Sequence, residues 1–231
     1  MKDIQVIGFD ADDTLWVNEP HYQAVGREFC ELMTPWLPPD RSAEELYGTE
    51  MANMKLYGYG AKSVMLSLVE TALRIGGDKV PAAVLRRLLE SGRRLLDFPI
   101  ELLPGVTEVL RALKGRYRLV LITKGDLLDQ ERKLERSGLK ECFHRVQILS
   151  DKREEDYRDL LAALAVEPRN FLMVGNSMKS DILPVLALGG SGVYIPFSVT
   201  WRHEHVKDAS PDPERFRQLS DISGLPGLLG R

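Results

Sequence analysis

The chain has 231 residues, of which 44% are hydrophobic and 28% charged, so it can bury a full-sized core and is neither collagen-like, coiled coil nor wholly disordered. Its 31 basic and 34 acidic side chains leave a formal net charge of −3, which provides no basic excess for binding a nucleic-acid backbone. Two distant cysteines, Cys30 and Cys142, match neither a disulfide framework nor metal-ligand spacing, and we read both as buried thiols in a reducing compartment. No apolar run approaches the roughly 18 residues of a membrane helix. We therefore expect a cytoplasmic protein with neither a nucleic-acid nor a membrane partner.

Short apolar runs recur along the chain, with helical patterns between them. The first run, residues 4–9, is nearly all apolar, as expected for a strand that is covered on both faces in a parallel sheet. Similar runs occur at residues 117–122, 143–149, 171–175 and 192–195. The spacing of Tyr157, Leu160, Leu161 and Leu164 predicts an intervening helix with one apolar face. This alternation is typical of an α/β fold with a doubly wound, mostly parallel sheet.

Residues 16–99 break the alternation. They contain helical stretches at about residues 22–33, 43–54, 61–75 and 80–96, and no convincing strand. The Pro and Gly pairs between these stretches, such as Pro38-Pro39 and Gly76-Gly77, are typical of loops. We predict an all-helical domain over residues 16–99, inserted into a Rossmann-like domain formed by residues 1–15 and 100–231.

Three carboxylates follow the first predicted strand in the sequence Asp10-Ala11-Asp12-Asp13-Thr14. Open α/β sheets place their ligands at the carboxyl ends of their strands. In an extended chain Asp10 and Asp12 point the same way, and like charges held that close need a cation or a proton between them. A calcium loop is excluded because Leu15 stands where such a loop requires glycine. The alternative interpretation is a helix N-cap with solvated acids.

Three further polar segments follow predicted strands. Thr123-Lys124-Gly125 suits either a phosphate cradle made by backbone N–H groups or an ordinary strand-to-helix turn. Lys152 opens a predicted helix inside a run of charged residues, where a solvated charged face is the alternative. Residues 175–181 begin with glycine and end with Asp181 at the predicted start of the next helix, where an N-cap would serve equally well. All these segments lie at strand ends in one sheet, so their side chains can converge.

The order of these motifs resembles the haloacid dehalogenase-like (HAD) hydrolase superfamily. The first motif of that family, Asp-x-Asp-x-Thr after a strand, matches Asp10, Asp12 and Thr14. The second motif, a Thr or Ser that ends a strand, matches Thr123, and a third-motif Lys followed by a paired-acid motif looks like Lys152 and residues 175–181. The resemblance covers essentially the whole chain, because the helical insertion stands where the family carries its first type of cap.

The resemblance implies a phosphatase with a covalent intermediate. Asp10 would be the nucleophile that forms an aspartyl-phosphate, and Asp12 would be the general acid for the leaving alcohol and then the general base for water. Thr123 and Lys152 would bind the phosphoryl group, together with Lys124 and Gly125 of the strand-end turn. Mg²⁺ would bridge Asp10, the backbone carbonyl of Asp12 and the fourth motif.

The fourth motif departs from the family pattern. It usually begins Gly-Asp in the family, whereas this chain has Gly175-Asn176. Asn176 still offers a carbonyl oxygen, and Asp181 can bind a metal directly or through water. The candidate Mg²⁺ ligands are therefore Asp10, Asp12, Asn176 and Asp181.

We expect a Mg²⁺-dependent hydrolase of a small phosphorylated metabolite. Dehalogenases of the superfamily lack the second acid of the first motif, so Asp12 favours phosphate ester hydrolysis over carbon–halogen cleavage. A phosphomutase shares the phosphatase motifs and stays an alternative. A non-catalytic phospho-aspartate switch or binding protein is the alternative from another class. The sequence gives neither the substrate nor the oligomeric state.

The segment His203-Glu204-His205 is a second candidate for a metal site. Its two histidines lack a third ligand at a known spacing. We assign the segment a structural role, or a role at the rim of the site.

Overall fold

The computed structural model describes residues 3–206 and 211–230, and the chain divides into two compact units. The sheet unit comprises Met1–Glu19, Ile100–Lys124 and Gln130–Arg231, and the helical unit comprises Pro20–Pro99 and Gly125–Asp129. The helical unit thus begins at Pro20 instead of Trp16. The reason is that the Trp16 side chain is fully buried in the core of the sheet unit.

The strands of the described chain form one six-stranded parallel sheet with the order β3-β2-β1-β4-β5-β6. Their bounds are β1 Val6–Phe9, β2 Arg118–Lys124, β3 Arg145–Leu149, β4 Phe171–Gly175, β5 Ser191–Tyr194 and β6 Phe216–Gln218. In the central strand, Val6 pairs with Arg118 on one side and with Phe171 on the other. The order confirms the doubly wound α/β fold, whereas β6 was not expected from the sequence.

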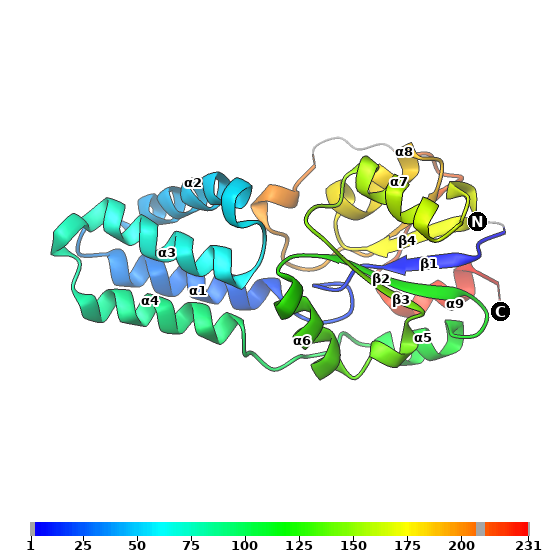
Figure 1. Ribbon diagram of the computed structural model, residues 1–231, viewed down its shortest axis with the longest axis horizontal. Helices are drawn as coiled ribbons and strands as arrows, with labels where there is room; N and C mark the ends of the chain where they lie inside the picture. The colour runs from blue at the N-terminus through cyan, green and yellow to red at the C-terminus, as the bar shows by residue number, and fades with distance from the viewer. Residues whose placement is uncertain (1–2, 207–210, 231) are drawn as a thin grey trace. The chain divides into compact units, whose positions relative to one another are not determined.

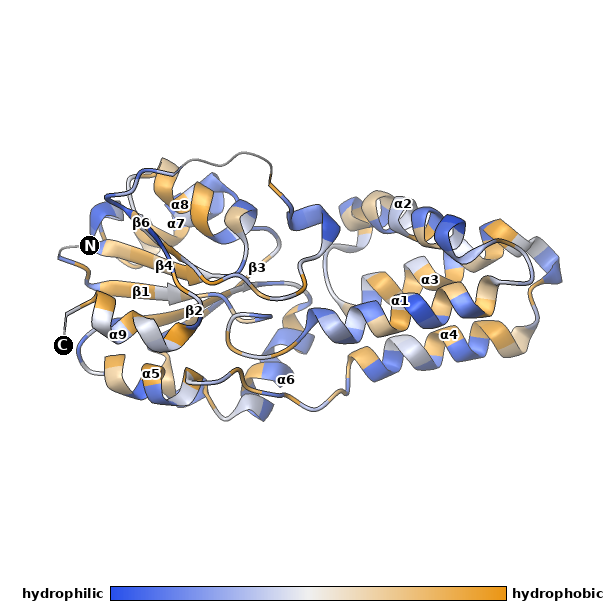
Figure 2. Cartoon of the chain, turned by 180° about the vertical axis from the view of Figure 1, so that it is seen from behind, coloured by the Kyte–Doolittle hydropathy of each residue, from blue (hydrophilic) through white to orange (hydrophobic). Residues whose placement is uncertain are grey.

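Helices cover both faces of the sheet (Figure 1). On one face, Ile7 and Phe9 share a core with α5 (Val106–Leu113), α6 (Leu127–Ser137) and α9 (Leu225–Leu228). On the other face, Val6 and Phe171 share a core with α7 (Glu154–Ala163) and α8 (Leu183–Ala187). Successive strand residues point to opposite faces, so a strand covered on both sides must be apolar throughout. Figure 2 shows the central strands as hydrophobic segments for this reason.

Short turns of other helix types lie between these elements. The 3₁₀ turns are Gly77–Lys79, Lys140–Cys142, Pro168–Asn170, Arg202–Glu204 and Ile222–Gly224, and a π-helical turn spans Met178–Ile182. The π-helical turn begins three residues after the end of β4 and leads into α8, and it contains the candidate site residue Asp181.

The helical unit is built from α1 (Glu19–Met33), α2 (Pro39–Tyr57), α3 (Ala61–Gly76) and α4 (Ala82–Leu95). Each helix places an apolar stripe in a common core that includes Phe29, Met33, Leu68, Leu88 and Leu95, and the stripes are visible in Figure 2. This packing follows from the 3.6-residue period of the apolar positions. The four helical stretches expected from the sequence are present, each within a few residues of the expected bounds.

Two other expectations concern cysteines and membranes. Cys30 and Cys142 are both free thiols, but each is only half-buried, so the expectation of buried thiols was wrong in degree. Within residues 3–206 and 211–230, no helix combines the length and the apolar character that crossing a membrane requires.

Candidate active site

Asp10 is the first residue after the central strand, at the edge where β2 and β4 also end. Its N–H donates to the Val174 carbonyl at 2.9 Å, so the register of the sheet fixes its backbone. A tight turn then folds the chain back over Asp10, with Leu15 N–H donating to the Ala11 carbonyl at 2.8 Å. This turn brings Thr14 Oγ1 within 3.0 Å of Asp10 Oδ2, to which it donates.

Lys152 joins two carboxylates from different strand ends. Its ammonium donates to Asp10 Oδ1 and, at 2.7 Å, to Asp181 Oδ1, and its side chain is only 1% exposed. Burial lowers the pKa of Lys152, but the charges of Asp10 and Asp181 outweigh burial and raise it. Burial, followed by the charge of Asp181, raises the pKa of Asp10 to about 7, although Lys152 opposes this increase.

The backbone around Lys152 differs from the sequence expectation. Lys152 does not open a helix, because α7 begins at Glu154. Asp156, in the first turn of the helix, satisfies the backbone of the residue before it: Arg153 N–H donates to Asp156 Oδ2 at 2.8 Å. Lys152 thus lies in the loop before the helix.

Asp181 fits beside β4 because the last residue of that strand has no side chain. A Cβ built on Gly175 would lie 2.2 Å from Asp181 Oδ2, which is far inside van der Waals contact. Ser177 N–H donates to the same oxygen at 2.9 Å, and Asp181 is 1% exposed. Asp181 belongs to the π-helical turn Met178–Ile182, so it is a buried partner of Lys152 and not a solvated N-cap.

Asn176 lies against the oxygen atoms that a hard cation would need. In the orientation that satisfies its hydrogen bonds, its amide nitrogen donates to Asp10 Oδ2 at 3.1 Å, to the Asp12 carbonyl at 3.3 Å and to Thr14 Oγ1 at 3.2 Å. Turning the amide over presents its oxygen at the same point, where Thr14 Oγ1 donates to it at 3.2 Å.

These donors fit Mg²⁺ in kind, because carboxylate, carbonyl and amide oxygens are its preferred protein ligands. The described residues contain no group of three or more His, Cys, Asp or Glu side chains that could hold a metal. A cation at Asp10 and Asp181 would therefore depend on the Asp12 carbonyl and on the neutral amide of Asn176 to complete its protein ligands.

The Asp12 side chain is bound separately from that of Asp10. Its Oδ1 accepts from Trp16 Nε1 at 2.7 Å and its Oδ2 accepts from Gln130 Nε2 at 2.8 Å. Lys133 Nζ reaches both oxygens, at 3.1 Å and 3.2 Å. The backbone and the side chain of Asp12 thus serve two different parts of the site.

The predicted phosphate-binding segment follows β2. Thr123 is buried at the end of this strand, two residues beyond Leu121, which pairs with Phe9. Lys124 donates to Glu204 Oε1 at 2.6 Å and to Ser180 Oγ at 2.8 Å. Gly125 has a φ of 144°, in the region that favours glycine, and it belongs to the helical unit.

Glu204 ties this strand end to the turn that holds Asp181. Besides Lys124, it binds Ser177 Oγ and, at 2.6 Å, Ser180 Oγ, both of which donate to its Oε2. Burial raises the pKa of Glu204, but the Lys124 charge and these hydrogen bonds outweigh burial and lower it to about 2. The role of this residue in the structure is therefore to cross-link two strand-end loops.

Sequence reasoning missed several side chains of this region. Gln130, Lys133 and Trp16 surround Asp12, and Glu204 was assigned only a general structural role. The spacing of Gln130 and Lys133, three apart on a helix, places them on one face, but nothing in the sequence shows that this face meets Asp12. The burial of Lys133 is visible only in the structure, so no sequence signal would have identified these residues.

A family model of the haloacid dehalogenase-like hydrolases matches residues 4–189, which include all the strand-end residues described above. The chain belongs to this family. The protein is therefore an enzyme of the hydrolase class. Its parallel sheet carries Asp10 directly after β1, Thr123 near the end of β2 and Asp181 in the turn after β4.

Several proteins are similar to this chain over half of its length or more. The pyrimidine 5′-nucleotidase YjjG of Escherichia coli is 29% identical over 234 aligned residues, covering 96% of this chain and 95% of that protein. The human N-acylneuraminate-9-phosphatase is 26% identical over 54% of this chain and 50% of its own length. A haloacid dehalogenase-like family hydrolase from Xanthomonas campestris shares 38% identity with a TM-score of 0.88, covering 98% of this chain and 90% of that one.

Proposed function

We propose that the protein is a Mg²⁺-dependent phosphomonoester hydrolase that forms an aspartyl-phosphate on Asp10. The observation that carries the proposal is the pair of acids on one strand end. Asp10 is buried and bound to Lys152, whereas Asp12, two residues later, is held by a separate set of donors. This difference in surroundings supports the assignment of Asp10 as the nucleophile and of Asp12 as the group that transfers protons.

In the first step the Asp10 carboxylate attacks phosphorus, and the bond between phosphorus and the ester oxygen breaks. The leaving alkoxide takes a proton from the Asp12 carboxyl group and departs as an alcohol. In the second step a water oxygen attacks the phosphorus of the aspartyl-phosphate while Asp12 takes a proton from that water. The bond between phosphorus and the Asp10 oxygen breaks, which regenerates the carboxylate and releases inorganic phosphate.

The charges around Asp10 decide whether a phosphate dianion can approach it. Lys152 neutralises part of the negative charge of Asp10 and Asp181, and Thr14 holds the second Asp10 oxygen. Asp10, the Asp12 carbonyl, Asn176 and Asp181 are the groups that would hold Mg²⁺, which when bound would supply additional positive charge for the transferring phosphoryl group. Thr123 and Lys152 would orient that group for in-line attack.

The substrate class is a small phosphorylated metabolite. Two of the relatives are a pyrimidine 5′-nucleotidase and an N-acylneuraminate-9-phosphatase, which supports a phosphomonoester of a primary alcohol as the first group of compounds to test. Asp12 distinguishes this reaction from carbon–halogen cleavage, because an alkoxide needs a proton on leaving whereas a halide does not.

The test is release of inorganic phosphate from 4-nitrophenyl phosphate, nucleoside 5′-monophosphates and sugar phosphates, with Mg²⁺ and with a chelator. Wild type, Asp10→Asn and Asp159→Asn are compared, the last being an exposed acid of α7 that serves as the matched control. We expect metal-dependent release by wild type and Asp159→Asn and none by Asp10→Asn, with intact-mass detection of one added phosphoryl group on quenched wild-type enzyme only. Undiminished turnover by Asp10→Asn would refute the proposal, and phosphate moved between hydroxyl groups without release would indicate a mutase.

A further inference from the structure

The Asp12 carboxylate has an unusually complete set of donors for a group that must transfer protons. Trp16 Nε1 donates at 2.7 Å and Gln130 Nε2 at 2.8 Å, and Lys133 Nζ lies 3.1 Å and 3.2 Å from the two oxygens. Trp16 is only four residues along the chain, whereas Gln130 and Lys133 come from α6. Two of the three donors are thus brought to Asp12 by the tertiary fold.

Lys133 is a buried cation. Its side chain is 4% exposed, and its ammonium also donates to Asn18 Oδ1 at 2.8 Å. Removing an ammonium from water costs several kcal/mol unless an anion and hydrogen-bond acceptors replace the water. A sequence that keeps a lysine in this position therefore needs Asp12 to stay beside it, and the reverse holds for the Asp12 side chain.

Gln130 lies one helical turn before Lys133 on the same face of α6. Its side chain is buried, and its amide nitrogen is also 3.4 Å from the Lys124 carbonyl. The helix therefore presents a neutral donor and a charged donor to the two oxygens of one carboxylate. Such an arrangement fixes the rotation of the carboxylate as well as its position.

We propose that Lys133 and Gln130 are positioning residues that hold the Asp12 side chain in the orientation from which it transfers protons. The inference rests on the proposed function, in which Asp12 gives a proton to the leaving alkoxide and takes one from water. An aspartate without these donors would populate several side-chain rotamers, and a displacement of about 1 Å at a reacting group can cost about 100-fold in rate.

A purely structural ion pair predicts a different result. If Lys133 only fastened α6 to the loop after β1, its loss would lower stability and slow all substrates alike. If it positions Asp12, its loss would slow substrates in proportion to their need for a proton on the leaving oxygen. 4-Nitrophenolate leaves as a stable anion and needs little protonation, whereas the alkoxide of a nucleoside 5′-monophosphate needs a full proton. The value of kcat/KM isolates this step, since it reports on events up to departure of the leaving group.

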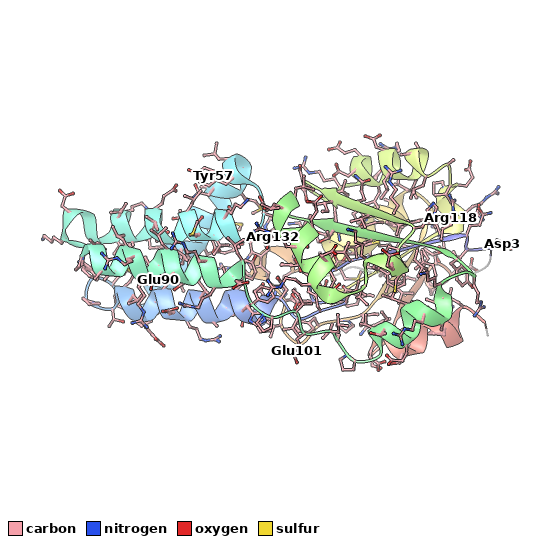
Figure 3. The ribbon with its side chains drawn as sticks, turned by 60° about the horizontal axis from the view of Figure 1, so that its bottom comes forward. Asp3, Tyr57, Glu90, Glu101, Arg118 and Arg132 are labelled. Carbon is pink, nitrogen blue, oxygen red and sulfur yellow. The ribbon has the colours of Figure 1, made fainter. Side chains whose placement is uncertain are left out.

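The experiment compares kcat/KM for 4-nitrophenyl phosphate and for the nucleoside 5′-monophosphate that wild type hydrolyses best. The variants are Lys133→Met, Lys133→Arg, Gln130→Met and the control Arg132→Met, which removes an exposed cation from the same helix (Figure 3). We expect Lys133→Met to lower the nucleotide value about 100-fold or more, within the range for loss of general acid catalysis, and the aryl value by less than about threefold. Lys133→Arg should recover part of the loss, and Arg132→Met should match wild type.

Gln130→Met keeps the test decisive if Lys133→Met does not fold, because it removes a donor without leaving an unpaired buried charge. It should lower the nucleotide value about tenfold and leave the aryl value nearly unchanged, with a thermal unfolding midpoint close to that of wild type. Equal losses on both substrates in the folded variants, or no loss on either, would overturn the positioning role.

The same measurements separate this inference from the proposed function. If wild type is active and Asp10→Asn is inactive, the hydrolase stands whatever the Lys133 and Gln130 variants show. If wild type releases phosphate from none of the aryl, nucleoside and sugar phosphates tested, the proposed function fails and the positioning role is refuted with it.

Discussion

Lys152 Nζ lies 2.7 Å from Asp181 Oδ1 while it also binds Asp10, so a single buried ammonium balances two carboxylates that are 171 positions apart in the chain. The three groups come from the loop before α7, the turn after β4 and the end of β1. The tertiary fold brings these three groups into contact. The attraction between the ammonium and the two carboxylates offsets the free energy of burying the charges only when all three groups are present.

Replacing Lys152 by Met should destabilise the protein by about 3–5 kcal/mol, because it leaves two buried carboxylates without their cation. The measurement is urea unfolding in chelator, with Lys140→Met as the control, since the Lys140 pair with Glu135 is 60% and 69% exposed and such surface ion pairs contribute little to stability. Adding Mg²⁺ should recover part of the loss in Lys152→Met by binding the folded state. Similar small losses in both variants would contradict the electrostatic account of the site.

Gly175→Ala should disturb the site because the added methyl group has no room beside Asp181. The added Cβ would lie 2.2 Å from Asp181 Oδ2, so the Asp181 side chain must leave its present position beside Lys152. We expect a loss of at least about 1–3 kcal/mol, typical of overpacking, together with a large loss of phosphatase activity. Gly26→Ala in α1 is the matched control, because a Cβ there meets nothing within 4 Å, and it should stabilise the protein by up to about 1 kcal/mol. An active, stable Gly175→Ala enzyme would show that Asp181 has another position available.

Asn176→Asp should lower the stability of the protein in chelator and raise its affinity for Mg²⁺. Without a cation, a carboxylate would face Asp10 Oδ2 and the Asp12 carbonyl, to which the amide nitrogen now donates at 3.1 Å and 3.3 Å, and repulsion should lower the unfolding temperature. With Mg²⁺, the added charge should tighten binding at least tenfold in calorimetry, a gain of about 1.4 kcal/mol. Unchanged Mg²⁺ affinity in Asn176→Asp would mean that residue 176 does not face the cation.

Glu204→Gln should alter the acid stability of the protein. The folded-state pKa of Glu204 is about 2 against an ordinary value of 4.5, so the charged form stabilises the fold fully above pH 4.5. That contribution is lost as the pH falls from 4.5 towards 2, and it amounts to about 3 kcal/mol. The stability difference between wild type and Glu204→Gln can be measured by urea unfolding at a series of pH values. It should be largest at neutral pH and should shrink as the pH falls from 4.5 towards 2. A stability difference that does not depend on pH would show that the Glu204 charge does not stabilise the folded state.

Much of the fold follows from local patterns, because buried parallel strands and amphipathic helices leave strong signals. Residues 171–175 illustrate this: the predicted strand has the same bounds as β4. Strand β6 left no such signal, since Phe216–Gln218 has only three residues and two of them are exposed. Its pairing with β5 is decided by the sheet edge and not by its own composition.

Some residues of the candidate site could likewise be expected from the sequence, and others could not. Asp10, Lys152, Asn176 and Asp181 were expected from strand-end positions, and the structure brings these four together. The donors around Asp12 were not expected, because contacts made by Lys133 or Gln130 depend on how α6 packs against the loop after β1. Charge and spacing show that a helix face is polar, but they do not show which group it meets.

The central place of β1 also affects how the chain folds. Val6 must pair with Arg118 and Phe171, so β1 gains its second neighbouring strand only after the chain has been made as far as Phe171, 165 positions beyond Val6. The helices of residues 20–99 have mostly local contacts and can form in the meantime, whereas pairing across such long separations is slow. We therefore expect the helical unit to fold first. Asp10, Lys152 and Asp181 should come together only in the last phase of folding, so an early intermediate should lack their mutual contacts.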